Sequence, residues 1–151
     1  MNAAVNAFFL ILKLLSLYFL VVSLFSLCKR KMQKSSTTQR RFAVLIAARN
    51  EESCIAGLIE SLLAQNYPSE LFDIWVLPNN CTDHTADAAR HAGGKVLEMP
   101  TSIHSKGAAL QYAANTLLHG SRYYDAFCVF DADNEVDPAF LSEMNQALSR
   151  S

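Results

Sequence analysis

The chain has 151 residues, of which 51% are apolar, and its formal net charge is −1 at pH 7. An intrinsically disordered protein is excluded because half of the residues are apolar, and a disulfide scaffold is excluded because four cysteines are widely spread. The net charge combines two unlike regions. Residues 1–41 carry seven basic and no acidic side chains, whereas residues 42–151 carry six basic and fourteen acidic ones and are long enough for one small domain.

The first region begins with an apolar run in which Lys13 is the only charged side chain between residues 3 and 28. The 22 residues of 7–28 exceed the roughly 20 that a helix needs to cross a bilayer. A lysine inside the membrane costs about 2.5–3.5 kcal/mol, which the many leucines and phenylalanines outweigh. The alternative is a cleaved signal peptide, but the basic residues follow the apolar run and no Ala-x-Ala site ends it. We predict a single-pass transmembrane signal anchor over residues 1–28.

Residues 29–41 form a basic and polar linker that begins with Lys29, Arg30 and Lys31. The positive-inside rule places this linker in the cytosol and the N-terminus outside the cell membrane. The basic cluster either holds the end of the helix at the interface or also binds anionic membrane lipid, at about 1 kcal/mol per residue. No aromatic residues interleave with the cluster, so a nucleic-acid partner is not expected.

From residue 42 onward, strand and helix patterns alternate. Continuous apolar runs predict strands over 42–48, 72–77, 95–99 and 126–130. Apolar residues at helical spacing predict helices over 52–65, 85–91 and 106–118, and Asp137 with Pro138 predicts the start of a last helix. This order predicts an α/β fold with a parallel sheet and helices on both faces. Ligands bind such sheets beyond the carboxyl ends of the strands.

Polar loops follow the first two predicted strands. Asn50 and Glu51 come after the first strand and either bind a base or ribose or cap the next helix. Asn79 and Asn80 begin the loop after the second strand, which is either a ligand-binding loop or an ordinary turn. Residues of these types do not decide between the alternatives by themselves.

The helix over 106–118 opens with Lys106 and Gly107. A lysine is unfavourable beside the positive end of a helix dipole, so its position is explained if an anion such as a diphosphate lies there. The alternative is a solvated lysine. His104 lies nearby in the sequence, and as a lone loop histidine it is expected to face solvent.

Two carboxylates, Asp131 and Asp133, follow the fourth predicted strand. If the chain stays extended, alternation places both on one side. Two such charges repel each other unless a cation lies between them. Mg²⁺ or Mn²⁺ commonly bridges protein carboxylates and substrate phosphates, so the pair is a candidate metal site.

Two other classes of nucleotide-binding protein are excluded because the sequence lacks their motifs. A dinucleotide-binding dehydrogenase needs G-x-G-x-x-G after the first strand, where this chain has AARNEE, and the P-loop motif is missing as well.

Four motifs in order carry a resemblance to one family: VLIAARNEE (44–52), VLPNNCTDHT (76–85), KGAAL (106–110) and FDADN (130–134). Together they resemble the donor-binding half of a family 2 glycosyltransferase with the GT-A fold. The resemblance covers residues 42–148, which is essentially the whole predicted domain.

The resemblance implies a donor that is a nucleotide-diphosphate sugar, with a UDP-sugar favoured. It places the nucleoside at Ala48 to Glu51, the diphosphate near Lys106, and a Mg²⁺ or Mn²⁺ ion on the DxD carboxylates. Asn79 stands where the family usually has an aspartate that reads the base. The implied donor-binding residues are Ala48, Arg49, Asn50, Glu51, Asn79, Asn80, Lys106, Gly107, Asp131 and Asp133, of which Asp131 and Asp133 are the implied metal ligands.

In this family the acceptor half, with its carboxylate general base, lies downstream of the DxD motif. The sequence stops at Ser151, so we expect an incomplete GT-A domain over 42–151, truncated before the catalytic base and completed by a missing C-terminal half or a partner chain. The alternative function is a non-catalytic membrane-bound protein that binds a nucleotide or a partner.

Overall fold

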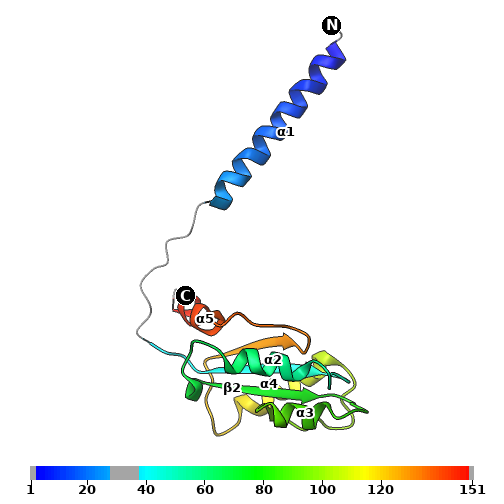
Figure 1. The fold of residues 1–151 in the computed structure, drawn as a ribbon, viewed down its shortest axis with the longest axis vertical. Coiled ribbons are helices and arrows are strands. Elements are labelled where there is room, and N and C mark those ends of the chain that lie inside the picture. The colour runs from blue at the N-terminus through cyan, green and yellow to red at the C-terminus, as the bar shows by residue number, and fades with distance from the viewer. Residues whose placement is uncertain (1–2, 28–37, 150–151) are drawn as a thin grey trace. The chain divides into compact units, whose positions relative to one another are not determined.

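The computed structural model describes residues 3–27 and 38–149, which belong to two compact units divided between residues 34 and 35 (Figure 1). The first unit contains helix α1, Ala3–Leu27. Its stretch Val5–Ser23 has a mean hydropathy of 2.3 and no buried part, so it is long and apolar enough to cross a membrane. The predicted basic cluster Lys29 to Lys31 lies outside the described residues.

The second unit is built on a four-stranded sheet in the order β3-β2-β1-β4, and every neighbouring pair is parallel. The predicted parallel α/β fold is therefore confirmed. The strands are β1 Phe42–Ala48, β2 Phe72–Pro78, β3 Lys95–Val96 and β4 Ala126–Asp131.

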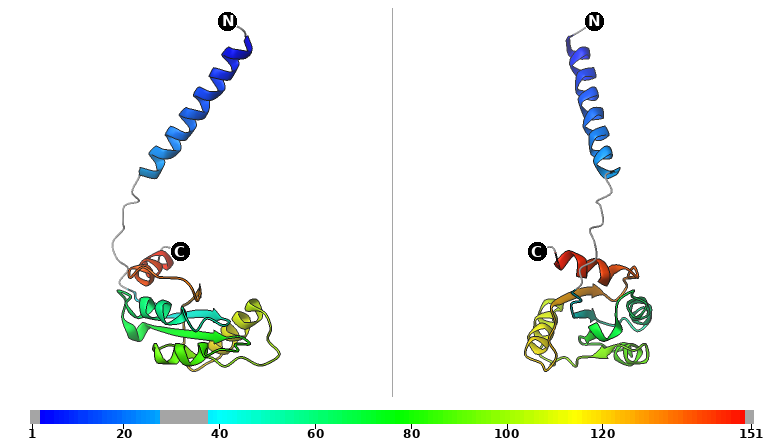
Figure 2. Two further views of the ribbon diagram at one scale, coloured as in Figure 1. Left: turned by 45° about the vertical axis from the view of Figure 1, so that its right-hand side comes forward. Right: turned by 90° about the vertical axis from the view of Figure 1, so that its left-hand side faces the viewer.

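Helices cover both faces of this sheet, as predicted (Figure 2). Alternate side chains of β1 serve the two faces, because successive residues of a strand point in opposite directions. Val44 and Ile46 lie in one core with the buried residues of α2, and Ala43 and Leu45 lie in another with those of α4. The helices are α2 Ile55–Leu63, α3 Thr85–His91, α4 Lys106–Leu118 and α5 Phe140–Leu148, and a 3-10 turn, η1, spans Ser69–Leu71.

Three predicted elements have wrong boundaries, and the strands predicted over 72–77 and 126–130 each extend one residue further, to Pro78 and Asp131. The strand predicted over 95–99 ends at Val96, since Val96 pairs with Val76 and β2 stops two residues later at Pro78, which has no N–H to continue a ladder. The helix predicted over 52–65 spans only Ile55–Leu63. At its start, the residues from Glu51 to Cys54 form a turn in which the Glu51 carbonyl accepts hydrogen bonds from the N–H groups of Cys54 and Ile55. The last helix starts at Phe140 because Asp137 caps a preceding turn by accepting from the Ala139 N–H at 2.8 Å.

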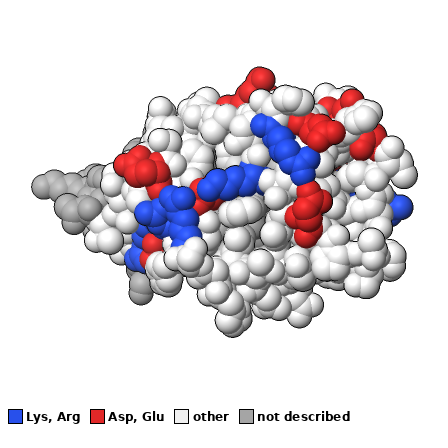
Figure 3. Space-filling model, turned by 90° about the horizontal axis from the view of Figure 1, so that it is seen from below, with Lys and Arg blue, Asp and Glu red and all other residues white. Residues whose placement is uncertain are grey.

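A buried carboxylate in β2 joins the sheet to the loop before β4. The Asp73 side chain is only 5% exposed, and it accepts hydrogen bonds from the Tyr124 hydroxyl at 2.6 Å and the Lys95 ammonium at 2.7 Å, while the Arg122 guanidinium pairs with it at 3.1 Å. Burial by itself raises the pKa of Asp73, but these hydrogen bonds and positive charges outweigh it, so the pKa lies below the usual value. On the face of the domain in Figure 3, basic side chains likewise adjoin acidic ones.

Because the folded pKa of Asp73 is lowered, its ionised form stabilises the fold above the unfolded pKa of about 3.9, and this contribution is lost as the pH falls through the folded value. We therefore expect D73N to lower the free energy of unfolding by about 1–3 kcal/mol at pH 7, since the two cations lose their charged partner. Urea unfolding of the full chain in detergent measures this, and the difference from the wild type should shrink below pH 4. D87N, in the exposed Asp87–Arg90 pair, serves as the control, with an expected effect under about 0.5 kcal/mol. A difference for D73N that is equal at pH 3 and pH 7 would contradict this role of the charge.

Candidate functional site at the strand ends

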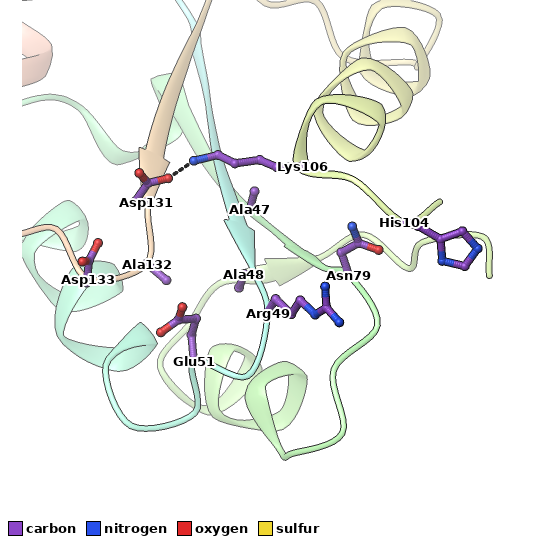
Figure 4. Close-up of a pocket in the computed structure, with 10 residues that line it drawn as sticks. All are labelled: Ala47, Ala48, Arg49, Glu51, Asn79, His104, Lys106, Asp131, Ala132 and Asp133. Carbon is purple, nitrogen blue, oxygen red and sulfur yellow. Dashed lines mark hydrogen bonds and ion pairs between the residues drawn. The ribbon is translucent and has the colours of Figure 1, made fainter. Parts of the chain in front are cut away.

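Three neighbouring strands end at the same edge of the sheet. Ala48 at the end of β1 is in register with Pro78 of β2, and Ala47 is in register with Asp131 of β4. The loops that follow these strands enclose, with the start of α4, a cavity of about 420 Å³ (Figure 4). The cavity is lined by Ala47, Ala48, Arg49, Glu51, Asn79, His104, Lys106, Asp131, Ala132 and Asp133.

The structure brings together seven of the ten residues that the sequence singles out. The other three, Asn50, Asn80 and Gly107, do not line the cavity. His104 was expected to face solvent, and although it is exposed it also lines the cavity. The sequence signal for this location is that His104 comes two residues before Lys106, in the loop that leads into α4.

Asn50 and Asn80 shape the loops around the cavity. Both have a positive φ, 58° and 53° respectively, a conformation that asparagine adopts more readily than most residues. The Asn50 Oδ1 accepts a hydrogen bond from the Thr82 N–H at 2.8 Å. The Asn80 Nδ2 donates to the Asn79 Oδ1 and to the Ile103 carbonyl, both at 2.8 Å.

Further hydrogen bonds join the loop after β1 to the loop after β2. The Glu51 N–H donates to the Thr85 hydroxyl at 2.9 Å, and the Glu52 N–H donates to the Asp83 carboxylate at 3.1 Å. The fully buried Thr85 in turn donates to Asp83 at 2.5 Å, and this hydrogen bond is the main reason that the pKa of Asp83 is below its usual value. The two loops therefore form one rigid wall of the site.

Lys106, the first residue of α4, forms an ion pair with the carboxylate of Asp131 at the end of β4. In the structure, the anion beside this lysine is therefore the Asp131 carboxylate of the same chain. Both side chains are about half exposed, at 51% and 58%. Water screens such a pair, so it contributes at most about 1 kcal/mol to stability and can be exchanged for other partners.

The extended conformation predicted for Asp131 to Asp133 is wrong. The strand ends at Asp131, and the chain turns so that the Asn134 N–H donates to the Asp131 carbonyl at 3.1 Å. Burial of Ala132 in the core favours this turn. Asp131 therefore faces Lys106, whereas Asp133 lies on the side of the cavity where Glu51 lies (Figure 4).

The thiol of Cys54 lies next to Glu51 and donates a hydrogen bond to its carboxylate at 3.0 Å. That hydrogen bond, burial, and the negative charges of Glu51 and Asp133 together raise the pKa of Cys54 to about 11. The raised pKa keeps this thiol protonated near neutral pH, which disfavours a nucleophilic role for Cys54. Within residues 3–27 and 38–149, no group of three or more His, Cys, Asp and Glu side chains forms a ready metal site. A cation here would therefore depend on ligands beyond Asp131 and Asp133, such as phosphate oxygens.

Comparison with known proteins identifies a family match for the second unit. Residues 43–151 match the family model described as Glycosyl transferase family 2. A beta-monoglucosyldiacylglycerol synthase of Nostoc sp. (strain PCC 7120) is 40% identical over 43 residues, which make up 28% of this chain and 9% of that protein. The enzyme of the same name from Synechocystis sp. (strain PCC 6803) is 29% identical over 51 residues, or 34% of this chain and 11% of that protein.

Solved structures share the fold. The mannosyltransferase PcManGT from Pyrobaculum calidifontis, in complex with GDP-Man and Mn²⁺, has a TM-score of 0.68 at 21% identity, over 88% of this chain and 39% of that chain. Glucosyl-3-phosphoglycerate synthase from Mycobacterium tuberculosis, in complex with Mn²⁺ and UDP, has a TM-score of 0.52 at 24% identity, over 68% of this chain and 37% of that chain. The chain thus spans less than half of these structures and about a tenth of the curated relatives.

The Thr85 hydroxyl bridges the two loops, because it accepts from the Glu51 N–H and donates to Asp83, and this bridge can be tested by substitution. We expect T85V to lower the free energy of unfolding by about 1–3 kcal/mol, because the substitution leaves the Glu51 N–H without its acceptor. It should also move the pKa of Asp83 up toward its usual value, which NMR titration of the carboxyl carbon measures. T85S keeps the hydroxyl and should retain the low pKa. An unchanged Asp83 titration in T85V would contradict the bridge.

Proposed function

The chain belongs to glycosyltransferase family 2, and we propose that its cavity at the carboxyl ends of β1, β2 and β4 binds a nucleotide-diphosphate sugar for transfer to an acceptor. The observation that carries this proposal is the convergence of seven donor-binding candidates, drawn from four separate motifs, on one cavity. A UDP-sugar is the favoured donor.

The charge distribution inside the cavity orients the proposed donor. Glu51, Asp131 and Asp133 lie toward one side, whereas Asn79 and His104 lie toward the other (Figure 4). The uncharged nucleoside fits the side of the cavity without carboxylates. The diphosphate then lies near Lys106, whose ammonium supplies the positive charge and whose helix contributes N–H groups. Ala47 and Ala48 form the apolar floor between the two sides.

Asp131 and Asp133 are the residues that would hold Mg²⁺ or Mn²⁺. They fit a hard cation because they are carboxylates on one cavity and because Asp131 already has a cation, the Lys106 ammonium, as its partner. A bound divalent ion supplies Lewis-acid stabilisation of the charge that builds up on the departing diphosphate. When the metal takes the place of Lys106 beside Asp131, the Lys106 ammonium is free to neutralise charge on the phosphates. The rigid wall of hydrogen-bonded loops holds the nucleoside in place during transfer.

We further propose the membrane arrangement that follows from the sequence. Residues 1–28 span the cell membrane once with the N-terminus outside, residues 29–41 link to the cytosolic face and contact membrane lipid, and residues 42–151 form the donor-binding part. The apolar stretch Val5–Ser23 supports the anchor.

The metal ligands are tested with the full chain in detergent, by isothermal titration of UDP with and without Mn²⁺. We expect D133A to remove the Mn²⁺-dependent part of UDP binding, while the thermal unfolding temperature changes little because Asp133 is exposed. E135A, an exposed acid two residues away and outside the cavity lining, should bind like the wild type. Wild-type binding of UDP that is the same with and without Mn²⁺ would contradict the proposed metal site. Release of UDP from a UDP-sugar with an acceptor would rule out the non-catalytic alternative.

The Lys106–Asp131 pair predicts that one substitution changes two affinities in opposite directions. K106M removes the cation that competes for Asp131, so Mn²⁺ binding without nucleotide should strengthen by up to about fivefold. UDP binding in the presence of Mn²⁺ should weaken by about tenfold, because the phosphates lose a charged hydrogen-bond donor. K106R keeps the charge and serves as the control. If both affinities move in the same direction, Lys106 does not exchange partners in this way.

A further inference from the structure

A second cavity, of about 320 Å³, lies on the face of the sheet that α4 covers, and none of its lining residues lines the strand-end cavity. Its walls are the last turn of α4, the sheet at β2 and β3, and the loop before β4. Small-molecule sites in proteins have volumes of roughly 300–1,000 Å³, so this cavity has room for a small ligand. Its apolar and charged lining residues are Trp75, Lys95, Leu97, Leu117, Arg122 and Tyr124.

The indole of Trp75 forms an apolar wall that the fold leaves partly uncovered. Trp75 is the one residue between Phe72 and Leu77 that is not buried. Within residues 3–27 and 38–149, the core on this face takes its helical side chains from α4 alone, and the neighbouring strand β3 has only two residues. The indole Nε1 donates to the Tyr124 hydroxyl at 3.3 Å, which holds the ring in place. A flat apolar group of a ligand therefore fits against this wall.

Two cations that are about half exposed line the same cavity. The Lys95 ammonium lies over the Trp75 ring, 5.5 Å from its centroid, and the Arg122 guanidinium lies nearby. Both pair with the single carboxylate of Asp73, so these three side chains keep one excess positive charge. In the part of the chain that the structure describes, Asp73 is the hydrogen-bond acceptor of Lys95, and the remaining N–H groups of the ammonium are open to solvent and to a ligand.

We propose that this second cavity binds a small aromatic carboxylate, with its ring against Trp75 and Leu97 and its carboxylate at the Lys95 ammonium. The carboxylate accepts the N–H groups that Asp73 leaves open, and such a charge-assisted hydrogen bond is stronger than a neutral one. The excess positive charge favours an anion over a neutral molecule of the same shape. This inference goes beyond the proposed donor site, because the two cavities share no residue.

A matched pair of probes tests the proposal. The chain has one tryptophan, so the indole N–H of Trp75 gives a single NMR resonance that reports directly on this cavity. The full chain in detergent is titrated with cinnamate and with cinnamamide, which have nearly the same planar shape and differ in charge. We expect cinnamate to shift the indole resonance saturably, with an affinity at least about fivefold higher than that of cinnamamide, since only the acid pairs with the Lys95 ammonium.

Two variants test the charge responsible. K95M removes the ammonium and keeps an apolar stem, so the ratio of cinnamate to cinnamamide affinity should fall toward one. Asp73 retains Arg122 and Tyr124 as partners in K95M, which preserves the fold. R90M removes a cation from the exposed Arg90–Asp87 pair, outside the cavity lining, and should leave the ratio unchanged. The probes partition into detergent equally for both variants, so a difference between them comes from the cavity.

A cinnamate titration that leaves the wild-type indole resonance unshifted would overturn the inference, and so would equal wild-type affinities for the acid and the amide. A K95M protein that keeps the wild-type ratio would overturn it as well. The wild-type comparison decides the matter even where a variant does not fold. None of these outcomes bears on UDP binding, which tests the proposed function separately.

Discussion

The parallel pairing of β1 with β2 on one side and with β4 on the other is the constraint on which the site depends. The register ends all three strands at one level, with Ala48 beside Pro78 and Ala47 beside Asp131. Residues that are up to 86 positions apart in sequence, from Ala47 to Asp133, therefore line one cavity. The buried faces of β1 hold this register, because a shift of one residue would exchange the side chains of the two cores.

Polar loops at a sheet edge need their own support, and here the loops support each other. Asn50 and Thr85 link the loop after β1 to the loop after β2, and the Asn80 side chain links the latter to the segment before α4. These residues do not bind a ligand in our proposal, yet they fix those that do. The Lys106–Asp131 pair differs because it is exposed and its partners can be exchanged. The site thus combines a hydrogen-bonded side, where we propose that the nucleoside binds, with an exposed charged side.

The sequence predicted much of this architecture for identifiable reasons. The strand over 42–48 and the helices over 85–91 and 106–118 were predicted to the residue, because their apolar pattern and their polar ends agree. The end of β3 at Val96 could not be predicted, since it depends on where the neighbouring strand β2 ends. The turn at Ala132 follows from core packing that a local pattern does not contain. His104 was missed because only the folded loop brings it to the cavity.

The central claim is that the strand-end cavity binds the nucleotide. Amide hydrogen exchange of the full chain in detergent, with and without UDP and Mn²⁺, tests it directly. We expect slower exchange in residues 47–52, 79–85, 103–107 and 131–134, and unchanged exchange in α5. Protection confined to other segments, or no change at saturating UDP, would contradict the claim.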